Sequence, residues 1–279
     1  MTVREIGEEL LRWIFPPKCV ACGRLLARGE TYLCASCERD YQSAREQVCP
    51  ACLEPLSACT CPNRYLERNG VRTVAKLYAY RPQETDLSTN RLIYRLKKVK
   101  SEAVIDFLAG ELAARLTPML QDGKQYVLVG VPRSRAAIRK YGGDHVLLLV
   151  RALSRKTGIS YLRAVKRIGH AGQQKKKNYS ARILAADTSY TPVTKYDLHG
   201  KQVILVDDIV TSGASLVACA RAVRKLGARK VMAAVIGSTF RYADLIGRRR
   251  FDEERKARRL SRVKNLRFRF HQKTKAKTQ

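Results

Sequence analysis

The stretch that decides the fold runs from Val203 to Ser215 and reads VILVDDIVTSGAS. Its first four residues form an apolar run, which is typical of a strand buried in a parallel sheet. Two adjacent acids, Asp207 and Asp208, end this run, and a loop of small residues then opens a helical pattern. Ligands of open parallel sheets bind beyond the carboxyl ends of the strands, where such residues emerge. The stretch therefore predicts a ligand site at the edge of a parallel sheet.

The loop that follows the acids has the composition of a phosphate cradle. It consists of Thr211, Ser212, Gly213, Ala214 and Ser215. Its backbone N–H groups and hydroxyls can point at one phosphate, and the positive end of the next helix adds to the attraction. Two carboxylates beside that phosphate suit the paired hydroxyls of a ribose, either directly or through a magnesium ion. This combination predicts a ribose 5-phosphate site. The acidic strand end of another doubly wound protein, such as a phosphate-transfer receiver, is the alternative.

The part of the chain that contains this loop alternates strand and helix patterns. Strand patterns cover residues 71–80, 126–131, 202–206 and 231–236, and helical patterns cover residues 102–116, 144–156 and 214–226. Such alternation predicts an α/β fold with a parallel sheet covered by helices on both faces. The segment from His170 to Ser180 is polar and basic and lacks periodicity, so we interpret it as a mobile loop.

The cysteines set the amino-terminal part of the chain apart. Eight of the nine fall into two groups of four, namely Cys19, Cys22, Cys34 and Cys37, and Cys49, Cys52, Cys59 and Cys61. Paired thiolates complete the closed tetrahedral shell of a structural zinc ion, so the groups predict two zinc sites. The second group is less regular, because a single residue separates its last pair. An iron–sulfur cluster or free thiols are the alternatives. Cys219 lies on an apolar helical stripe and is expected in the core.

The charge of the chain is strongly positive. The sequence has 55 Lys and Arg residues against 24 acids, a formal net charge of +31. Such an excess attracts polyanions, so we expect single-stranded DNA or another nucleic acid as a partner. Solubility alone is the alternative explanation. The segment from Arg248 to Gln279 carries fourteen bases against three acids and reads as a basic tail that binds nucleic acid.

The first residues and the length of the apolar runs indicate where the protein is expected in the cell. The first residues lack the pattern of a secretory signal, which favours a cytoplasmic protein. No apolar run reaches the roughly 18 residues needed to cross a bilayer, so we expect no membrane span.

Several segments resemble known families. The stretch from Val203 to Ser215 resembles the phosphoribosyl-diphosphate signature of type I phosphoribosyltransferases. The segment Ile14–Gly23, which reads IFPPKCVACG, combined with that signature resembles the ComF family of competence proteins, with a match from about residue 13 to residue 236. Residues 91–97 resemble the basic helix that this family carries before its sheet, and residues 131–135 lie where it carries its pyrophosphate-facing loop.

The resemblance implies roles for the acids, the loop after them and two arginines. It implies that Asp207 and Asp208 hold the ribose hydroxyls, that the 211–215 loop holds the 5-phosphate, and that Arg133 and Arg135 meet the pyrophosphate together with magnesium. The family's Gly-Phe-Asn-Gln run is replaced here by residues 142–145, GGDH. We interpret His145, the last of these, as a surface or capping residue.

The resemblance also implies an organisation and two functions. We expect an N-terminal helix and double zinc module over residues 1–62, a phosphoribosyltransferase-like domain over 63–247, and the basic tail over 248–279. One function is that of a phosphoribosyl-diphosphate-binding protein of DNA uptake, competence or DNA processing, with the proteins of those processes as partners. The other is that of a phosphoribosyltransferase acting on a nucleobase or amine acceptor.

Overall fold

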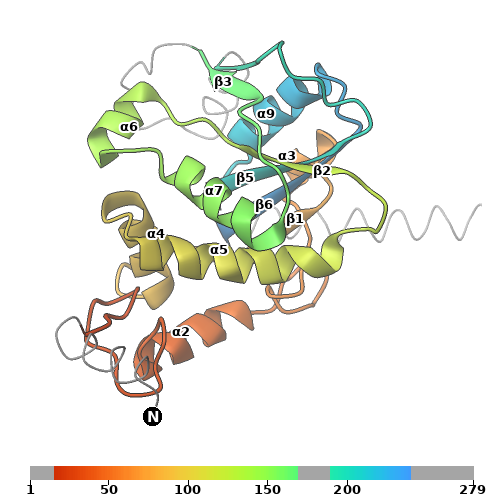
Figure 1. Ribbon diagram of the computed structural model, residues 1–279. Helices are drawn as coiled ribbons and strands as arrows, with labels where there is room; N and C mark the ends of the chain where they lie inside the picture. The colour runs from red at the N-terminus through yellow and green to blue at the C-terminus, as the bar shows by residue number, and fades with distance from the viewer. Residues whose placement is uncertain (1–15, 169–188, 240–279) are drawn as a thin grey trace, which may run out of the picture. The chain divides into compact units, whose positions relative to one another are not determined.

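The computed structural model describes residues 16–168 and 189–239 (Figure 1). The expected N-terminal helix, the basic loop at 170–180 and the basic tail lie outside the described residues.

A four-stranded parallel sheet forms the centre of the described chain (Figure 1). Its order is β1 (Val74–Ala79), β6 (Lys230–Ser238), β5 (Gln202–Val210) and β2 (Tyr126–Gly130). A parallel bridge between Leu128 and Tyr161 extends the sheet beyond β2. All six residues of β1 are buried, including Lys76, because both faces of the sheet are covered. The predicted α/β fold with a covered parallel sheet is confirmed.

Three helices cover one face of the sheet. They are α4 (Ser88–Lys98), α5 (Glu102–Leu116) and α7 (His145–Thr157), and Figure 1 shows α5 and α7 packed side by side. Side chains cap two of them, since Ser101 accepts the N–H of Val104 at 3.4 Å and Asp144 accepts that of Leu147 at 3.0 Å. The basic helix α4 follows β1, so the expectation that it precedes the sheet is wrong.

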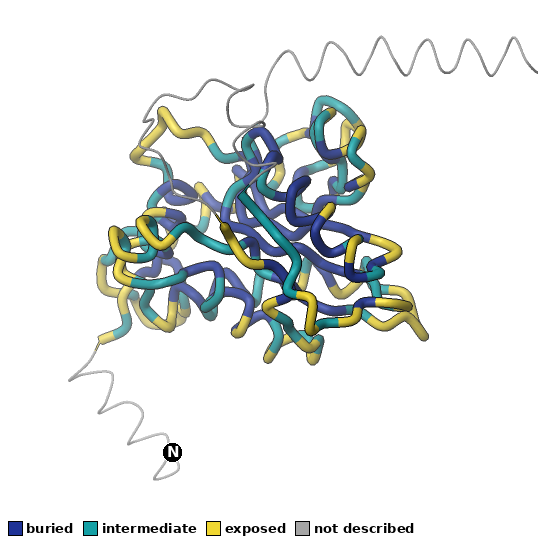
Figure 2. The backbone as a smooth tube through the Cα atoms, turned by 90° about the horizontal axis from the view of Figure 1, so that it is seen from above, coloured by how far each residue is buried: buried dark blue, intermediate teal, exposed yellow. Residues whose placement is uncertain are grey.

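The other face carries α9 (Ala214–Arg224) and the short helix α3 (Arg64–Arg68). An antiparallel ribbon of β3 (Val165–Arg167) and β4 (Tyr190–Pro192) packs against α9. Between β2 and α7 the chain forms the short helix α6 (Arg135–Tyr141), and η1 (Thr117–Met119) follows α5. Figure 2 shows the strands as a buried centre and the connecting loops as an exposed rim. Cys219 is fully buried on α9, as its helical stripe predicts.

The cysteine-rich segment packs on the helices of the first face. Its one helix in the described part is α2 (Ala35–Arg45), which contacts α4 and β1. The Tyr41 ring lies 5.4 Å from the ring of Phe107 on α5, and the Tyr41 hydroxyl donates to Glu111 at 2.9 Å. The Tyr32 hydroxyl donates to Asp106 at 2.5 Å. Apolar and polar contacts thus join this segment to the sheet domain.

Strand β5 is longer than its apolar run predicts. The run ends at Val206, but the strand continues through both acids to Val210. Pairing with β6 extends it, because Ile209 and Val210 lie opposite Gly237 and Ser238. Neighbouring backbone, not local hydrophobicity, therefore sets where the strand ends. In the described part of the chain, no helix is long and apolar enough to cross a membrane.

Candidate functional site

The two acids of the signature are buried where β5 approaches its carboxyl end. Asp207 is 7% exposed and Asp208 is 4% exposed. Their carboxylates also bind the local backbone: Asp207 Oδ1 accepts the N–H of Asp208 at 2.9 Å, and Asp208 Oδ1 accepts the N–H of Ile209 at 2.7 Å. These bonds leave one oxygen of Asp208, Oδ2, for side chains.

Three cationic or ring nitrogens surround that free oxygen. His145 Nε2 lies 2.9 Å from Asp208 Oδ2, Lys97 Nζ lies at 3.1 Å, and Arg133 Nη1 lies at 3.7 Å. They come from α7, from α4 and from the loop after β2. Asp208 is therefore the point at which three separate elements meet.

This arrangement separates the pKa values of the two acids. Burial would raise the pKa of Asp208, but the hydrogen bond with His145 and the charges of Lys97 and Arg133 outweigh burial and hold the pKa well below its usual range. Burial and the negative charge of Asp208 raise the pKa of Asp207 well above its usual range. Asp208 is thus the more acidic member of the pair.

The interpretation of His145 as a surface or capping residue is wrong. The side chain is 1% exposed and bonds to Asp208, while Asp144 caps the helix. Its second ring nitrogen, Nδ1, is buried and has no hydrogen-bond partner among the described residues. A neutral ring whose Nε2–H donates to Asp208 leaves only an acceptor unpaired, whereas a protonated ring would leave a buried donor unpaired. The site also includes Lys97, to which sequence reasoning assigned no role.

The loop at 211–215 is supported from α3. Gly213 has a φ of +79°, and a Cβ atom at this position would lie 2.7 Å from Leu66 Cγ, so both conformation and space require glycine. Asn63 caps α3 by accepting the N–H of Leu66 at 2.9 Å, and its amide donates to the Thr211 carbonyl at 3.2 Å. Within the loop, Ser212 Oγ accepts the N–H of Ala214 at 3.3 Å. The loop therefore leads into α9 with a backbone that its neighbours already hold in place.

The two arginines of the loop after β2 differ in their surroundings. Arg133 reaches Asp208, as described above, and is partly buried. Arg135 is exposed at the start of α6 and makes no ion pair with an acid in the described ranges. Both line a cavity of about 540 Å³ beside β2.

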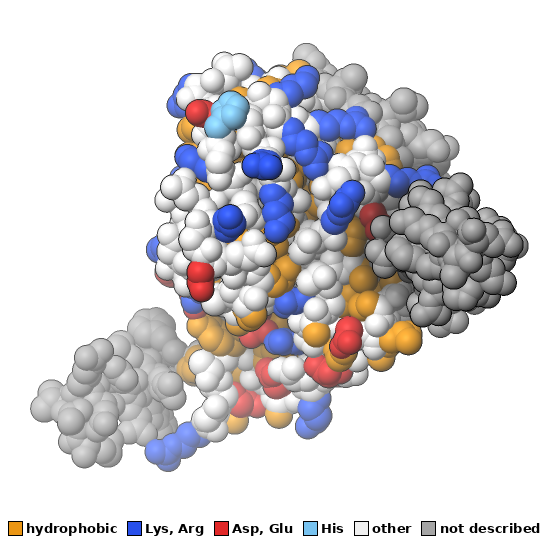
Figure 3. Space-filling view, turned by 90° about the vertical axis from the view of Figure 1, so that its right-hand side faces the viewer, with side chains coloured by type: hydrophobic (Ala, Val, Ile, Leu, Met, Phe, Trp, Pro, Cys, Tyr) orange, Lys and Arg blue, Asp and Glu red, His pale blue; other side chains and the backbone are white. Residues whose placement is uncertain are grey.

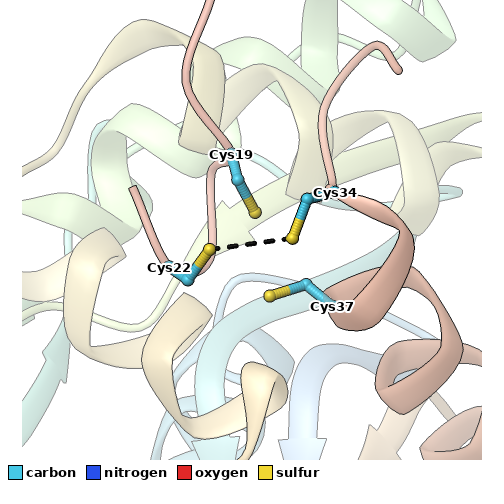
Figure 4. Close-up of side chains that lie close together, drawn as sticks. All are labelled: Cys19, Cys22, Cys34 and Cys37. Carbon is cyan, nitrogen blue, oxygen red and sulfur yellow. Dashed lines mark hydrogen bonds between the residues drawn. The ribbon is translucent and has the colours of Figure 1, made fainter. Parts of the chain in front are cut away.

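The sulfur atoms of each cysteine group converge. In each of the two groups, all four Sγ atoms lie within 4.8 Å of one another. Figure 4 shows the first group, in which Cys22 Sγ and Cys34 Sγ are 3.7 Å apart. A zinc ion with four Zn–S bonds of about 2.3 Å requires sulfur separations of about 3.8 Å. Both groups are therefore consistent with one structural zinc ion each.

Two cationic side chains of the sheet domain donate hydrogen bonds to the segment that contains the second cysteine group. Lys76 on β1 is fully buried, and its Nζ donates to the Cys61 carbonyl at 2.9 Å. Arg115 on α5 donates to the carbonyls of Ala58 at 2.7 Å and Cys59 at 3.2 Å. Four thiolates around a divalent zinc ion would carry a net negative charge, which these cations offset.

Comparison with known proteins agrees with the two-part architecture. Residues 99–239 match the phosphoribosyl transferase domain family, and residues 10–66 match the double zinc ribbon domain. The ribose-phosphate pyrophosphokinase of Pyrococcus furiosus is 39% identical over 59 residues, which is 21% of this chain and 21% of that protein. The chain thus spans about a fifth of the length of this curated relative.

Two solved phosphoribosyltransferases are among the structures to which this chain is similar. The adenine phosphoribosyltransferase of Saccharomyces cerevisiae is 19% identical with a TM-score of 0.35, over 50% of this chain and 71% of that one. The hypoxanthine phosphoribosyltransferase of Staphylococcus aureus is 15% identical with a TM-score of 0.30, over 48% of this chain and 62% of that one. The family match itself covers half of the sequence. The chain therefore belongs to the phosphoribosyl transferase domain family and carries a double zinc ribbon in front of that domain.

Proposed function

We propose that this chain is a cytoplasmic protein of the ComF type, which binds phosphoribosyl diphosphate with magnesium and takes part in DNA uptake, competence or DNA processing. One observation carries the ligand assignment: the ionised Asp208, surrounded by Lys97, Arg133 and His145, lies just ahead of a phosphate loop held by α3.

Each part of the site then has a role. Asp207 and Asp208 bind the ribose hydroxyls, and the 211–215 loop binds the 5-phosphate through N–H groups at the start of α9. Arg133 binds the pyrophosphate, with Arg135 further out on the same loop. Magnesium, when bound, would neutralise part of the pyrophosphate charge, and the two acids are the carboxylate ligands available to it. The residues of the chain thus act by positioning the ligand and stabilising its charge.

Calorimetric titration with phosphoribosyl diphosphate and magnesium tests this assignment. The wild-type chain binds the ligand, and Asp208→Asn weakens binding at least tenfold, because an amide attracts neither the metal nor the surrounding cations. Asp197→Asn is the matched control, since this carboxylate is 76% exposed and bonds to His199 away from the loop. A wild-type chain that does not bind the ligand would overturn the proposal.

The nucleic-acid part of the proposal is supported by charge. The net charge is +31, and most Lys and Arg side chains of the face in Figure 3 gather over its upper part. We assign non-specific binding of single-stranded DNA to the tail Arg248–Gln279, which lies outside the described residues. If about 6 of its bases meet phosphates, log affinity falls with log salt at a slope of about −4. Deleting the tail flattens that slope and leaves phosphoribosyl-diphosphate binding intact; an unchanged slope would exclude the tail as the binding element.

The second candidate function is transfer of phosphoribose to a nucleobase or amine acceptor. The family match favours it, because the matched region contains the acids, the phosphate loop and Arg133 together. Pyrophosphate release in the presence of candidate acceptors distinguishes the two functions. A binding protein releases none above the rate of solvent hydrolysis, whereas a transferase releases it with one acceptor class.

A further inference from the structure

The two cysteine groups differ in how far solvent reaches their thiols. All nine cysteines lie in the described residues, and Cys52 is the only exposed one among them. Cys22, at the corresponding position of the first group, is only partly exposed and packs against the main core. The first cysteines of these two CxxC pairs, Cys19 and Cys49, are fully buried. A small oxidant in solution can therefore reach one thiol of the second group directly, whereas the first group has no equally accessible thiol.

The turns that follow these two cysteines differ in their backbone. Leu53 follows Cys52 with a φ of +64° and a side chain that is 67% exposed. The residue after Cys22 is Gly23, which has a φ of +82°. A Cβ atom disfavours this left-handed conformation, whereas glycine adopts it freely. The turn at the second group is therefore both more exposed and conformationally less favourable than the turn at the first.

We propose that Cys52 is a site of reversible oxidation by hydrogen peroxide, and that the product is a disulfide within the second cysteine group. The Cys52 thiolate attacks one peroxide oxygen, the O–O bond breaks, and the hydroxide that leaves takes up a proton to become water. This step gives a sulfenic acid at Cys52. A neighbouring thiolate then attacks the Cys52 sulfur, so that the S–S bond forms, the S–O bond breaks, and a second hydroxide is protonated to water. The two sulfurs lose the two electrons that the peroxide gains.

The attacking thiolate is available inside the same group. All four Sγ atoms lie within 4.8 Å of one another, so Cys49, Cys59 and Cys61 surround the Cys52 sulfur. A small movement of the exposed turn is enough to form an S–S bond of about 2 Å. The disulfide takes two of the four sulfur ligands from the site, and a zinc ion bound there is released.

A short piece of chain joins the second group to the 211–215 loop. Cys61 is two residues from Asn63, whose amide donates to the Thr211 carbonyl at 3.2 Å. Leu66, on the same helix α3, lies against Gly213. Loss of zinc therefore loosens the segment that supports this loop. Oxidation would then weaken phosphoribosyl-diphosphate binding, a consequence that rests on the proposed function, whereas the oxidation of Cys52 itself does not.

Titration of the reduced, zinc-loaded full chain with hydrogen peroxide tests the site. A chromophoric chelator should report release of one zinc ion per chain, while the other ion is retained. Peptide mass spectrometry should find Cys52 in a disulfide with Cys49, Cys59 or Cys61, and a dithiol reductant with added zinc should restore the starting state. Release of both ions together, absence of release, or a disulfide that does not include Cys52 would each overturn the proposal.

A histidine variant removes the oxidisable thiol but keeps four zinc ligands. Cys52→His gives a Cys₃His set, which zinc accepts, and the exposed position has room for the ring. The variant should hold two zinc ions and release the second-site ion at least tenfold more slowly in peroxide. Cys22→His, the matched control at the corresponding position of the first group, should release one ion as fast as the wild type. Equal protection in both variants would overturn the role of Cys52; if Cys52→His does not hold its second ion, the disulfide mapping of the wild type decides.

Amide hydrogen exchange and calorimetry follow the effect of oxidation on the loop. Oxidation should raise the exchange rates of residues 211–215 and weaken phosphoribosyl-diphosphate binding about tenfold, and reductant with zinc should reverse both changes. Zinc release with unchanged exchange in this segment would overturn the coupling to the loop. A reduced chain that does not bind phosphoribosyl diphosphate contradicts the proposed function alone, because zinc release and hydrogen exchange still report the oxidation.

Discussion

The two cysteine groups share one chemistry but lie in different surroundings. In the first group, Cys19, Cys34 and Cys37 belong to the large apolar core that also contains α5 and α7. The second group has a small core of its own, formed by Cys49, Cys59, Leu56 and Ala79. The second group is in addition held by hydrogen bonds from Lys76 and Arg115 of the sheet domain.

The position of the second group along the chain explains why this difference matters. Its last ligand, Cys61, is two residues from Asn63, which caps α3 and bonds to the Thr211 carbonyl. Leu66, on the same short helix, packs under Gly213. The first cysteine group thus belongs to the main core, whereas the second group directly precedes the segment that supports the 211–215 loop.

The largest effect is expected when the first group is broken. Cys34→Ser removes one zinc ligand inside the main core, so the free energy of unfolding falls by more than about 3 kcal/mol, because zinc binding energy is folding energy. Elemental analysis should show loss of one of two zinc ions, and thermal unfolding measures the loss of stability. Two retained zinc ions would contradict the assignment of Cys34 as a ligand.

Breaking the second group should have a smaller effect on stability and a larger one on ligand binding. Cys59→Ser also removes one zinc ion, but the small core around it limits the loss of stability. Phosphoribosyl-diphosphate binding should weaken about tenfold, or about 1.4 kcal/mol, because α3 loses its anchor. Titration of both serine variants at a temperature where each is folded makes the comparison. If the two variants lose the same amount of affinity for phosphoribosyl diphosphate, the proposed difference between the two cysteine groups is contradicted.

Replacing the buried lysine tests the support of the second group by the sheet domain. Lys76→Met keeps the length of the side chain but leaves the Cys61 carbonyl unpaired, at a cost of about 1 to 3 kcal/mol. Zinc should leave the second site faster when a chelator is added, while release from the first site stays unchanged. If the variant loses zinc from both sites at equally increased rates, Lys76 does not stabilise the second site selectively.

The smallest expected effect comes from the cap of α3. Asn63→Ala removes a helix cap and the bond to Thr211, and should lower the free energy of unfolding by about 1 kcal/mol. Phosphoribosyl-diphosphate affinity should fall severalfold. Tyr32→Phe is the matched control, because it removes one hydrogen bond, that to Asp106, from the segment that contains the first cysteine group, and should leave affinity unchanged. Equal affinities in the two variants would show that the position of the loop does not depend on α3.

Local sequence patterns predicted those helices and sites whose formation depends only on residues within the same segment. Helix α5 has the bounds Glu102–Leu116 that its apolar stripe predicts, because a buried helical face repeats with the helical period. The same holds for the two cysteine groups, whose spacing by itself brings the thiols together. The end of β5 could not be predicted in this way, because pairing with β6 extends it past the acids.

Local sequence patterns were sufficient to predict the strands of the parallel sheet, the two cysteine groups and the loop after Asp208, since each follows from residues close together in the chain. Only the tertiary fold brings His145 and Lys97 to Asp208 and Lys76 to the Cys61 carbonyl. His145 lies 63 residues from Asp208. No local period encodes such a contact, because it arises only when the helices α4 and α7 pack beside the carboxyl end of β5.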